Sequence, residues 1–214
     1  MTEQTKETID RAVRIRIRSL QYDYRESLSE RISELERRVK EALLSETAEE
    51  SQEDEALYDD SACGEAGEPY EMVTDGRFRM KGSLCELSYM ENDENGMGET
   101  RTTLVFSKNR PWILTLTRSG VVRMTLSFEA GRHHIGTYHF GAMQRMISDR
   151  PNVMIASYAR RVENRILEDG TLDLDYIVEV RGMDTQRTVF SLSIGELSLA
   201  PKGLSEQSDG GENG

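Results

Sequence analysis

From residue 70 onward the chain is a succession of short stretches in which apolar and polar residues alternate, with turn-forming residues between them. Alternation with a period of two is typical of β-strands that bury one face. No helical pattern separates the stretches, and parallel neighbours would need long crossover connections. We therefore expect an antiparallel up-and-down meander. Closing into a barrel pairs the backbone groups of its two edge strands, so we expect a barrel rather than an open sheet. Turns are expected at residues 81–82, 92–96, 109–111, 119–120, 130–131, 140–141, 150–151, 169–170 and 182–184.

An earlier stretch shows the same alternation and predicts the first strand of the barrel, at residues 12–21. Its apolar face and its cationic face are formed by Val13, Ile15 and Ile17 and by Arg14, Arg16 and Arg18, respectively. A row of arginines on one side of a strand is typical of a solvent-exposed face rather than of a nucleic-acid site.

Residues 26–45 follow a different period. Apolar residues recur there at spacings of three and four, which predicts an amphipathic α-helix inserted into the barrel sequence. They are Leu28, Ile32, Leu35, Val39 and Leu43. The apolar stripe must pack on something, and three partners stay open: the barrel's own surface or open end, a second copy in a short coiled coil, or a foreign protein.

The net charge of −12 belongs to one segment. Between Glu41 and Asp75 there are 13 acidic residues and no Lys or Arg, and the rest of the chain is close to neutral. Residues 47–69 have little to bury, so we expect a mobile acidic linker that completes an insertion at 25–67. The remainder of the barrel is expected at 70–197, followed by a disordered tail at 202–214. Such acidity disfavours nucleic acid and anionic membranes as partners.

No stretch approaches the run of apolar residues that crosses a bilayer, and the N-terminal residues lack the pattern of a secretion signal. The two cysteines, Cys63 and Cys85, are too few for a disulfide framework or a four-ligand zinc site. We therefore expect a cytoplasmic protein with reduced thiols.

Several short motifs resemble the YwiB-like family of small bacterial proteins of unknown function. They are Ser88-Tyr89, Thr102-Thr103, Arg118-Ser119-Gly120, Phe128-x-x-Gly131-x-x-His134 with Tyr138 beyond it, and Asp175-Tyr176. The resemblance spans about residues 73–195, and residues 12–20 match the family's first strand. It implies a calycin-type β-barrel, related in shape to lipocalins and fatty-acid-binding proteins, and it implies no reaction. The insertion at 25–67 departs from the family pattern.

Arg118 is the most suggestive candidate for a binding site. It shares a strand face with Trp112, Leu114 and Leu116, whose bulk makes that face the expected interior. An arginine at the rim of a barrel interior needs an anionic partner, because burying an unpaired charge is costly. That partner is either a ligand carboxylate or phosphate, or an internal salt bridge or turn carbonyl.

His134 and Tyr138 share another strand face, and Tyr89 shares one with Cys85 and Leu87. His134 and Tyr138 either line a pocket as hydrogen-bond donors, or are partly exposed polar surface or a core pair. Tyr89 either lines a pocket or belongs to the core. Alternation separates His134 from its neighbour His133, so no metal site is expected.

No phosphate-loop, hydrolase or zinc-protease motif occurs, and we expect no cofactor. Asp173 and Asp175 are expected on the outer face, where a paired-carboxylate mechanism lacks a protected cleft. The leading hypothesis is a non-enzymatic barrel that binds a small, partly apolar anionic ligand through Arg118, His134, Tyr138 and Tyr89. The alternative is a protein-interaction module that uses helix 26–45 and the acidic linker.

Overall fold

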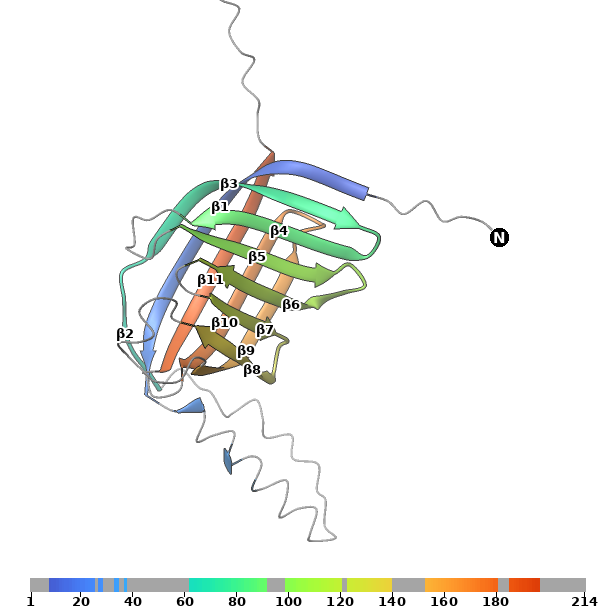
Figure 1. The fold of residues 1–214 in the computed structure, drawn as a ribbon. Helices are drawn as coiled ribbons and strands as arrows, with labels where there is room; N and C mark the ends of the chain where they lie inside the picture. Colours follow the sequence, from blue (N-terminus) through green and yellow to red (C-terminus); the bar gives the residue numbers. More distant parts are fainter. Residues whose placement is uncertain are drawn as a thin grey trace, which may run out of the picture.

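The structure, a computed structural model, describes residues 8–25, 27, 28, 33, 34, 37, 62–91, 99–120, 123–139, 153–180 and 185–196. These residues form eleven β-strands (Figure 1). The strands are β1 (Thr8–Tyr24), β2 (Cys63–Ala66), β3 (Tyr70–Lys81), β4 (Leu84–Glu91), β5 (Thr100–Ser107), β6 (Arg110–Ser119), β7 (Arg123–Phe128), β8 (Arg132–His139), β9 (Val153–Arg165), β10 (Thr171–Val180) and β11 (Thr185–Glu196).

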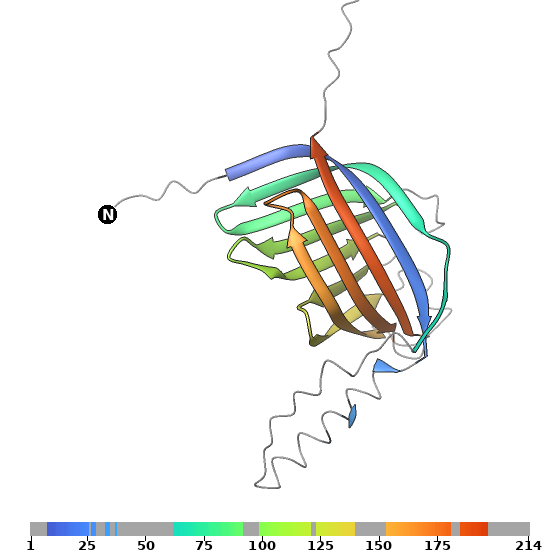
Figure 2. The ribbon, with the colours of Figure 1, turned by 180° about the vertical axis from the view of Figure 1, so that it is seen from behind.

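The strands close into an antiparallel barrel. From β3 to β11 each strand pairs with the next one in the chain, and β1 pairs with both β3 and β11. Ten strands thus form a continuous ring, while short β2 lies beyond β3 along the same edge of β1. Figures 1 and 2 show β1 and β11 crossing the back of the barrel side by side. The predicted antiparallel β-barrel is confirmed.

The prediction of an inserted helix has to be corrected. All elements of the described residues are strands, so the expectation of a barrel with an inserted amphipathic helix was wrong for that part of the chain. Most of residues 26–45 lie outside the described residues. An apolar stripe draws its helical stability mainly from the surface it packs on, and residue spacing does not supply that surface.

The residues at the start of that segment contact the barrel. Leu28 is fully buried in a small apolar cluster on the outside of the barrel, where it packs with Tyr24, Tyr158 and Ile177. Ser27 beside it donates a hydrogen bond of 2.9 Å to the buried carboxylate of Glu179. The chain that leaves β1 is therefore anchored to the outer faces of β9 and β10.

Part of the expected linker is also a strand. β2 lies within residues 47–69, where it pairs with Tyr22 and Tyr24 of β1. Composition alone shows that this stretch has few apolar groups to bury. It does not show that the unpaired backbone groups of β1 offer it hydrogen bonds. The expected tail at 202–214 lies outside the described residues.

The barrel interior is filled by alternate residues of each strand. Val13, Ile15 and Ile17 are at most 3% exposed, as the period-two pattern predicts. They join one large core cluster with side chains of β3 to β7 and β9 to β11. The arginines of the same strand point outward, and Arg14 and Arg18 form ion pairs with Asp75 and Glu71 of β3.

Trp112 departs from the expected interior face. Leu114 and Leu116 are buried, but Trp112 is 51% exposed. The reason is a shift in register, since Phe106 pairs with Leu114 whereas the next residue, Ser107, pairs with Arg110. Trp112 falls within this irregular end of the β5–β6 hairpin, where strict alternation no longer decides which way a side chain points.

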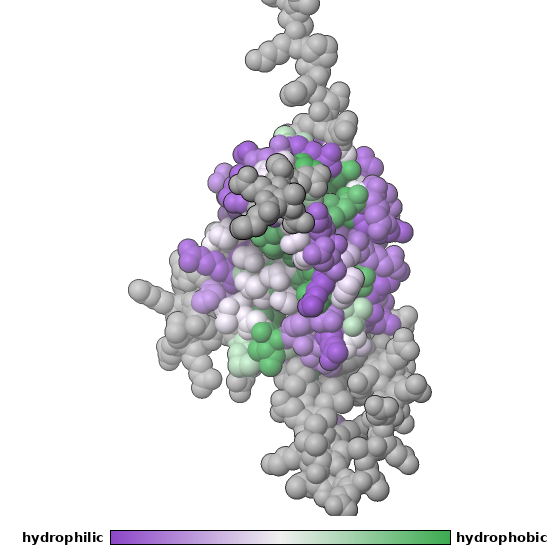
Figure 3. Space-filling model, turned by 90° about the vertical axis from the view of Figure 1, so that its right-hand side faces the viewer, coloured by the Kyte–Doolittle hydropathy of each residue, from purple (hydrophilic) through white to green (hydrophobic). Residues whose placement is uncertain are grey.

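The two ends of the barrel differ in their connections. Short turns join β3 to β4, β5 to β6, β7 to β8 and β9 to β10 at one end, and the glycines Gly82 and Gly170 supply positive φ angles of 64° and 82° there. The opposite end carries the longer connections, including residues 92–99 and 140–152. Figure 3 views the molecule from the side of the short hairpins and shows apolar patches among mostly hydrophilic residues.

None of the described residues belongs to a helix long and apolar enough to cross a membrane.

Two strand glycines provide a test of the close packing around β1. A Cβ on Gly76 would lie 2.3 Å from Ile15 Cδ1 and 2.7 Å from the Ser88 carbonyl oxygen, whereas one on Gly195 would have no neighbour closer than 3.9 Å. We expect Gly76→Ala to lower the free energy of unfolding by about 1–3 kcal/mol, because the strands must move apart. Gly195→Ala is the matched control, and urea denaturation measures both. Equal stabilities of the two variants would contradict the packing described here.

Candidate functional site

Cross-strand register brings residues of five neighbouring strands into one row on the inner face. Tyr89 of β4 lies opposite Thr102 of β5, and Thr102 lies opposite Arg118 of β6. The row continues through Met124 of β7 to Tyr138 of β8. Tyr89 and Thr102 are buried, which shows that the row faces the interior. Three of the four residues predicted to bind a ligand, Arg118, Tyr89 and Tyr138, thus come together.

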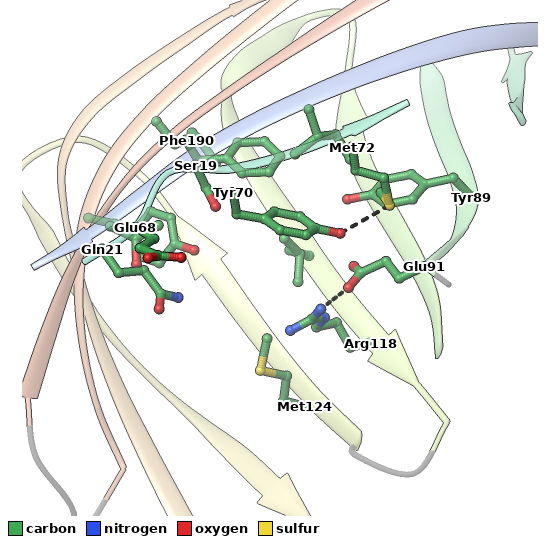
Figure 4. A pocket seen from close by; sticks show the side chains of 15 residues that line it. Ser19, Gln21, Glu68, Tyr70, Met72, Tyr89, Glu91, Arg118, Met124 and Phe190 are labelled. Atoms are coloured by element: carbon green, nitrogen blue, oxygen red, sulfur yellow. Dashed lines mark hydrogen bonds and ion pairs between the residues drawn. The ribbon is translucent and has the colours of Figure 1, made fainter. Parts of the chain in front are cut away.

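A cavity of about 320 Å³ lies beside this row, toward the end with the long connections. Side chains of seven barrel strands and of Glu68, just before β3, enclose it (Figure 4). Its lining residues are Ile17, Ser19, Gln21, Glu68, Tyr70, Met72, Tyr89, Glu91, Leu116, Arg118, Met124, Leu174, Tyr176, Thr188 and Phe190. The cavity is therefore mostly apolar, with a few charged and hydroxyl groups.

Arg118 has an internal partner. Its Nη2 donates to Oε2 of Glu91, the last residue of β4, and the two side chains are 22% and 15% exposed. The other oxygen of Glu91 accepts a hydrogen bond of 2.5 Å from the Thr102 hydroxyl. Of the two readings of Arg118, an internal salt bridge is thus present. Sequence reasoning missed Glu91, although its position two residues after Tyr89 places it on the same face of β4.

The salt bridge uses only part of the hydrogen-bonding capacity of Arg118. A guanidinium carries five N–H donors, and within the described part of the chain Arg118 gives one hydrogen bond, to Glu91. Figure 4 shows the guanidinium reaching from β6 into the cavity, between Glu91 and Met124. Donors of a largely buried cation therefore border the cavity.

Three tyrosines near Arg118 have pKa values above the ordinary value of a tyrosine, so they stay protonated to higher pH. Burial raises the pKa of Tyr89 well above 10, although the Arg118 charge and a hydrogen bond with Thr102 act in the opposite direction. Burial also raises the pKa of Tyr176, which bonds the Thr188 side chain, and that of Tyr138. These residues offer neutral hydroxyl groups rather than charges. Tyr176 was not among the predicted site residues.

The fourth predicted residue, His134, lies elsewhere. It is four residues before Tyr138 on β8, which separates the two by about 13 Å along a strand, and it pairs with Ser157 of β9. His134 does not line the cavity. Its Nε2 atom is buried and has no hydrogen-bond partner among the described residues. The structure therefore does not bring His134 to Arg118.

The far side of the cavity is polar as well. Glu68 and Gln21 lie across the cavity from the Arg118–Glu91 pair, and the Tyr70 ring projects between the two sides (Figure 4). The Tyr70 hydroxyl contacts the Met72 sulfur at 3.2 Å. Among the described residues, the charged side chains that line the cavity are thus Glu68, Glu91 and Arg118, and the charges of Glu91 and Arg118 offset each other.

A second group of charged residues lies on the outer face and has a structural role. Arg187 of β11 makes two hydrogen bonds of 2.9 and 2.8 Å to Asp175 of β10, and a third of 3.2 Å to Cys63 of β2. The hydrogen bonds to Asp175 raise the pKa of Arg187 further. Asp173 and Asp175 thus face outward, as predicted, and Asp175 binds neighbouring strands together.

No group of three or more His, Cys, Asp or Glu side chains in the described ranges could hold a metal ion. Cys85 is fully buried in the core, and burial raises the pKa of its thiol. A buried thiol with a raised pKa is a poor nucleophile.

Comparison with known proteins gives a family and a fold. A family model described as a domain of unknown function, DUF1934, matches residues 59–192. The crystal structure of the ywiB protein from Bacillus subtilis is similar to this chain, with a TM-score of 0.51 at 16% sequence identity, over 87% of this chain and 93% of that one. At this identity the likeness extends to the fold alone. No curated protein matches.

The buried tyrosines predict how the protein responds to alkaline pH. Because the folded state raises the pKa of Tyr89, Tyr138 and Tyr176 above 10, it keeps protons that the unfolded chain releases. The free energy of unfolding therefore falls as pH rises through 10 and beyond. Absorbance of tyrosinate should show fewer than the eight tyrosines ionising near pH 10 in the folded protein. In urea all eight should ionise together, and the same behaviour in the folded protein would contradict this assignment.

Proposed function

Because the chain belongs to the DUF1934 family of domains of unknown function, which supplies no activity, we propose a function from the cavity: the barrel binds a small, partly apolar ligand with an anionic group. The observation that carries this proposal is the set of guanidinium donors of Arg118 that border a cavity with mostly apolar walls.

The size and walls of the cavity support a small organic ligand. Its volume of about 320 Å³ lies at the lower end of the range of small-molecule sites. Apolar side chains from opposite sides of the barrel line it, including Ile17, Met72, Leu116, Leu174 and Phe190. Burying an apolar ligand surface against such walls contributes about 25 cal/mol per Å². The ligand's apolar part would therefore provide most of the affinity.

Arg118 is the group that would orient such a ligand. The guanidinium is planar and presents donors along more than one edge, so an anion can bind one edge while Glu91 holds another. Tyr89 beside it is protonated and offers hydrogen bonding without adding charge. Tyr138, at the end of the same row, would take part only from the margin of the cavity. We leave His134 out of the proposed site because it lies farther along the barrel.

We propose binding without catalysis. Acid–base or nucleophilic catalysis needs a reactive group within reach of a substrate. Among the described residues, the carboxylates that line this cavity are Glu91, which is held by Arg118 and Thr102, and Glu68, which is exposed to solvent. Burial raises the pKa of the lining tyrosines Tyr89 and Tyr176. The free thiols of Cys63 and Cys85 fit a reducing compartment, so we also propose a cytoplasmic location. A role for residues 26–45 in binding another protein stays a prediction, because most of them lie outside the described residues.

Two related fluorescent dyes test the proposed site. Anilinonaphthalene sulfonate carries an anionic group, and N-phenylnaphthylamine has the same rings without it. We expect Arg118→Ala to weaken binding of the sulfonate by about 10- to 100-fold, the range for losing a charge-assisted hydrogen bond. Binding of the uncharged dye should change by less than about twofold, since its contacts are apolar. Fluorescence titration at equal ionic strength measures both affinities.

Arg101→Ala is the matched control. Arg101 adjoins Thr102 but is exposed on the outer face, so its removal changes the net charge equally without touching the cavity. Arg118→Ala leaves the Glu91 carboxylate without its cationic partner. The double variant Arg118→Met with Glu91→Gln removes both charges, and its affinity for the sulfonate should also fall relative to its affinity for the uncharged dye. The proposal fails if the wild-type protein binds neither dye, or if Arg101→Ala and Arg118→Ala weaken sulfonate binding equally.

A further inference from the structure

The carboxylate of Glu91 contacts Arg118, the residue that we propose binds the anionic group of the ligand. The Glu91 side chain is 15% exposed at the rim of the cavity, and both of its oxygens are engaged, one by Thr102 and one by Arg118. These two contacts therefore fix the position of the carboxylate. It neutralises a guanidinium that would otherwise be a largely buried, unpaired charge.

The negative charge of Glu91 also repels any second anion that binds Arg118. A ligand anion bound to another edge of the Arg118 guanidinium would lie within a few ångströms of the Glu91 carboxylate, because the guanidinium is small. Like charges at such separations repel more strongly in a protein cavity than in water. The side chains of Arg118 and Glu91 are only 22% and 15% exposed, so water screens this repulsion incompletely.

The other carboxylates nearby do not act on Arg118 in this way. Glu68 lines the same cavity, but it is exposed to solvent and lies across the cavity from Arg118 (Figure 4). Glu86 is on the same strand as Glu91, but it points to the outer face, where it pairs with Arg79 at 3.6 Å. Among the described residues, the carboxylate in contact with Arg118 is that of Glu91.

We propose that Glu91 sets the charge selectivity of the cavity, and this rests on the binding function proposed above. Because its negative charge offsets that of the Arg118 guanidinium, Glu91 makes electrostatic attraction too weak to bind an anion alone. Anions with an apolar body bind because the cavity walls add their own contribution. Small hydrophilic anions such as inorganic phosphate or acetate are excluded. The ligand class is therefore an amphipathic organic anion.

Glu91→Gln tests this inference, because it removes the negative charge and keeps a side chain of nearly the same shape. We expect the affinity for anilinonaphthalene sulfonate to rise about tenfold or more, which corresponds to about 1.4 kcal/mol. The affinity for uncharged N-phenylnaphthylamine should change by less than about twofold. Inorganic phosphate should displace the sulfonate dye from Glu91→Gln at concentrations that leave the wild-type complex intact.

Glu86→Gln is the matched control, since it removes one carboxylate from the outer face of the same strand, and it should change neither affinity. Glu91→Met gives a second neutral side chain in case Glu91→Gln does not fold, and thermal melting establishes which variant is folded. The selectivity inference is overturned if folded Glu91→Gln or Glu91→Met binds the sulfonate no more tightly than the wild-type protein does. If Arg118→Ala still weakens sulfonate binding in that case, the proposed function stands without it. If no variant and no wild-type protein binds either dye, both fail.

Discussion

Pairing of β1 with strands on both of its edges closes the barrel, and the rest of the structure depends on that closure. Residues of β1 such as Val13 and Ile17 pair with β3 on one side and with β11 on the other. The described strands form a closed ring, so inward side chains such as Ile15 and Leu174 are enclosed by neighbours from several strands. The contacts also join residues from the two ends of the sequence. The core therefore forms as one unit, and β1 holds it together.

Closure also creates the conditions under which the Arg118–Glu91 pair matters. On an open sheet these two side chains would be solvated, and an ion pair of that kind contributes little. Inside the barrel they are largely buried beside a mostly apolar cavity. An unpaired charge is costly there, and an added anion interacts strongly with both side chains because water screens their charges incompletely. The ion pair thus offsets a charge that would be costly to bury unpaired, and in our proposal it also selects among anionic ligands.

The parts of the fold that follow a regular period were predictable. The inward direction of Ile15, Leu116 and Tyr89 follows from alternation along their strands, because that rule is local. It failed at Trp112, where a register shift between β5 and β6 breaks the alternation. Composition likewise suggested no structure where β2 formed, because it does not reveal the backbone groups of β1 with which β2 pairs.

The amino-acid sequence by itself determined which face of each strand is apolar, and hence an antiparallel closed barrel with Arg118 on its inner side. These properties depend on neighbours a few residues apart. Only the tertiary structure decided which inward residues meet. Cross-strand register places Arg118 beside Thr102 and Glu91 and leaves His134 farther along the barrel, because a side chain's neighbours across a sheet depend on how whole strands align. The cavity, too, exists only where seven strands converge around it.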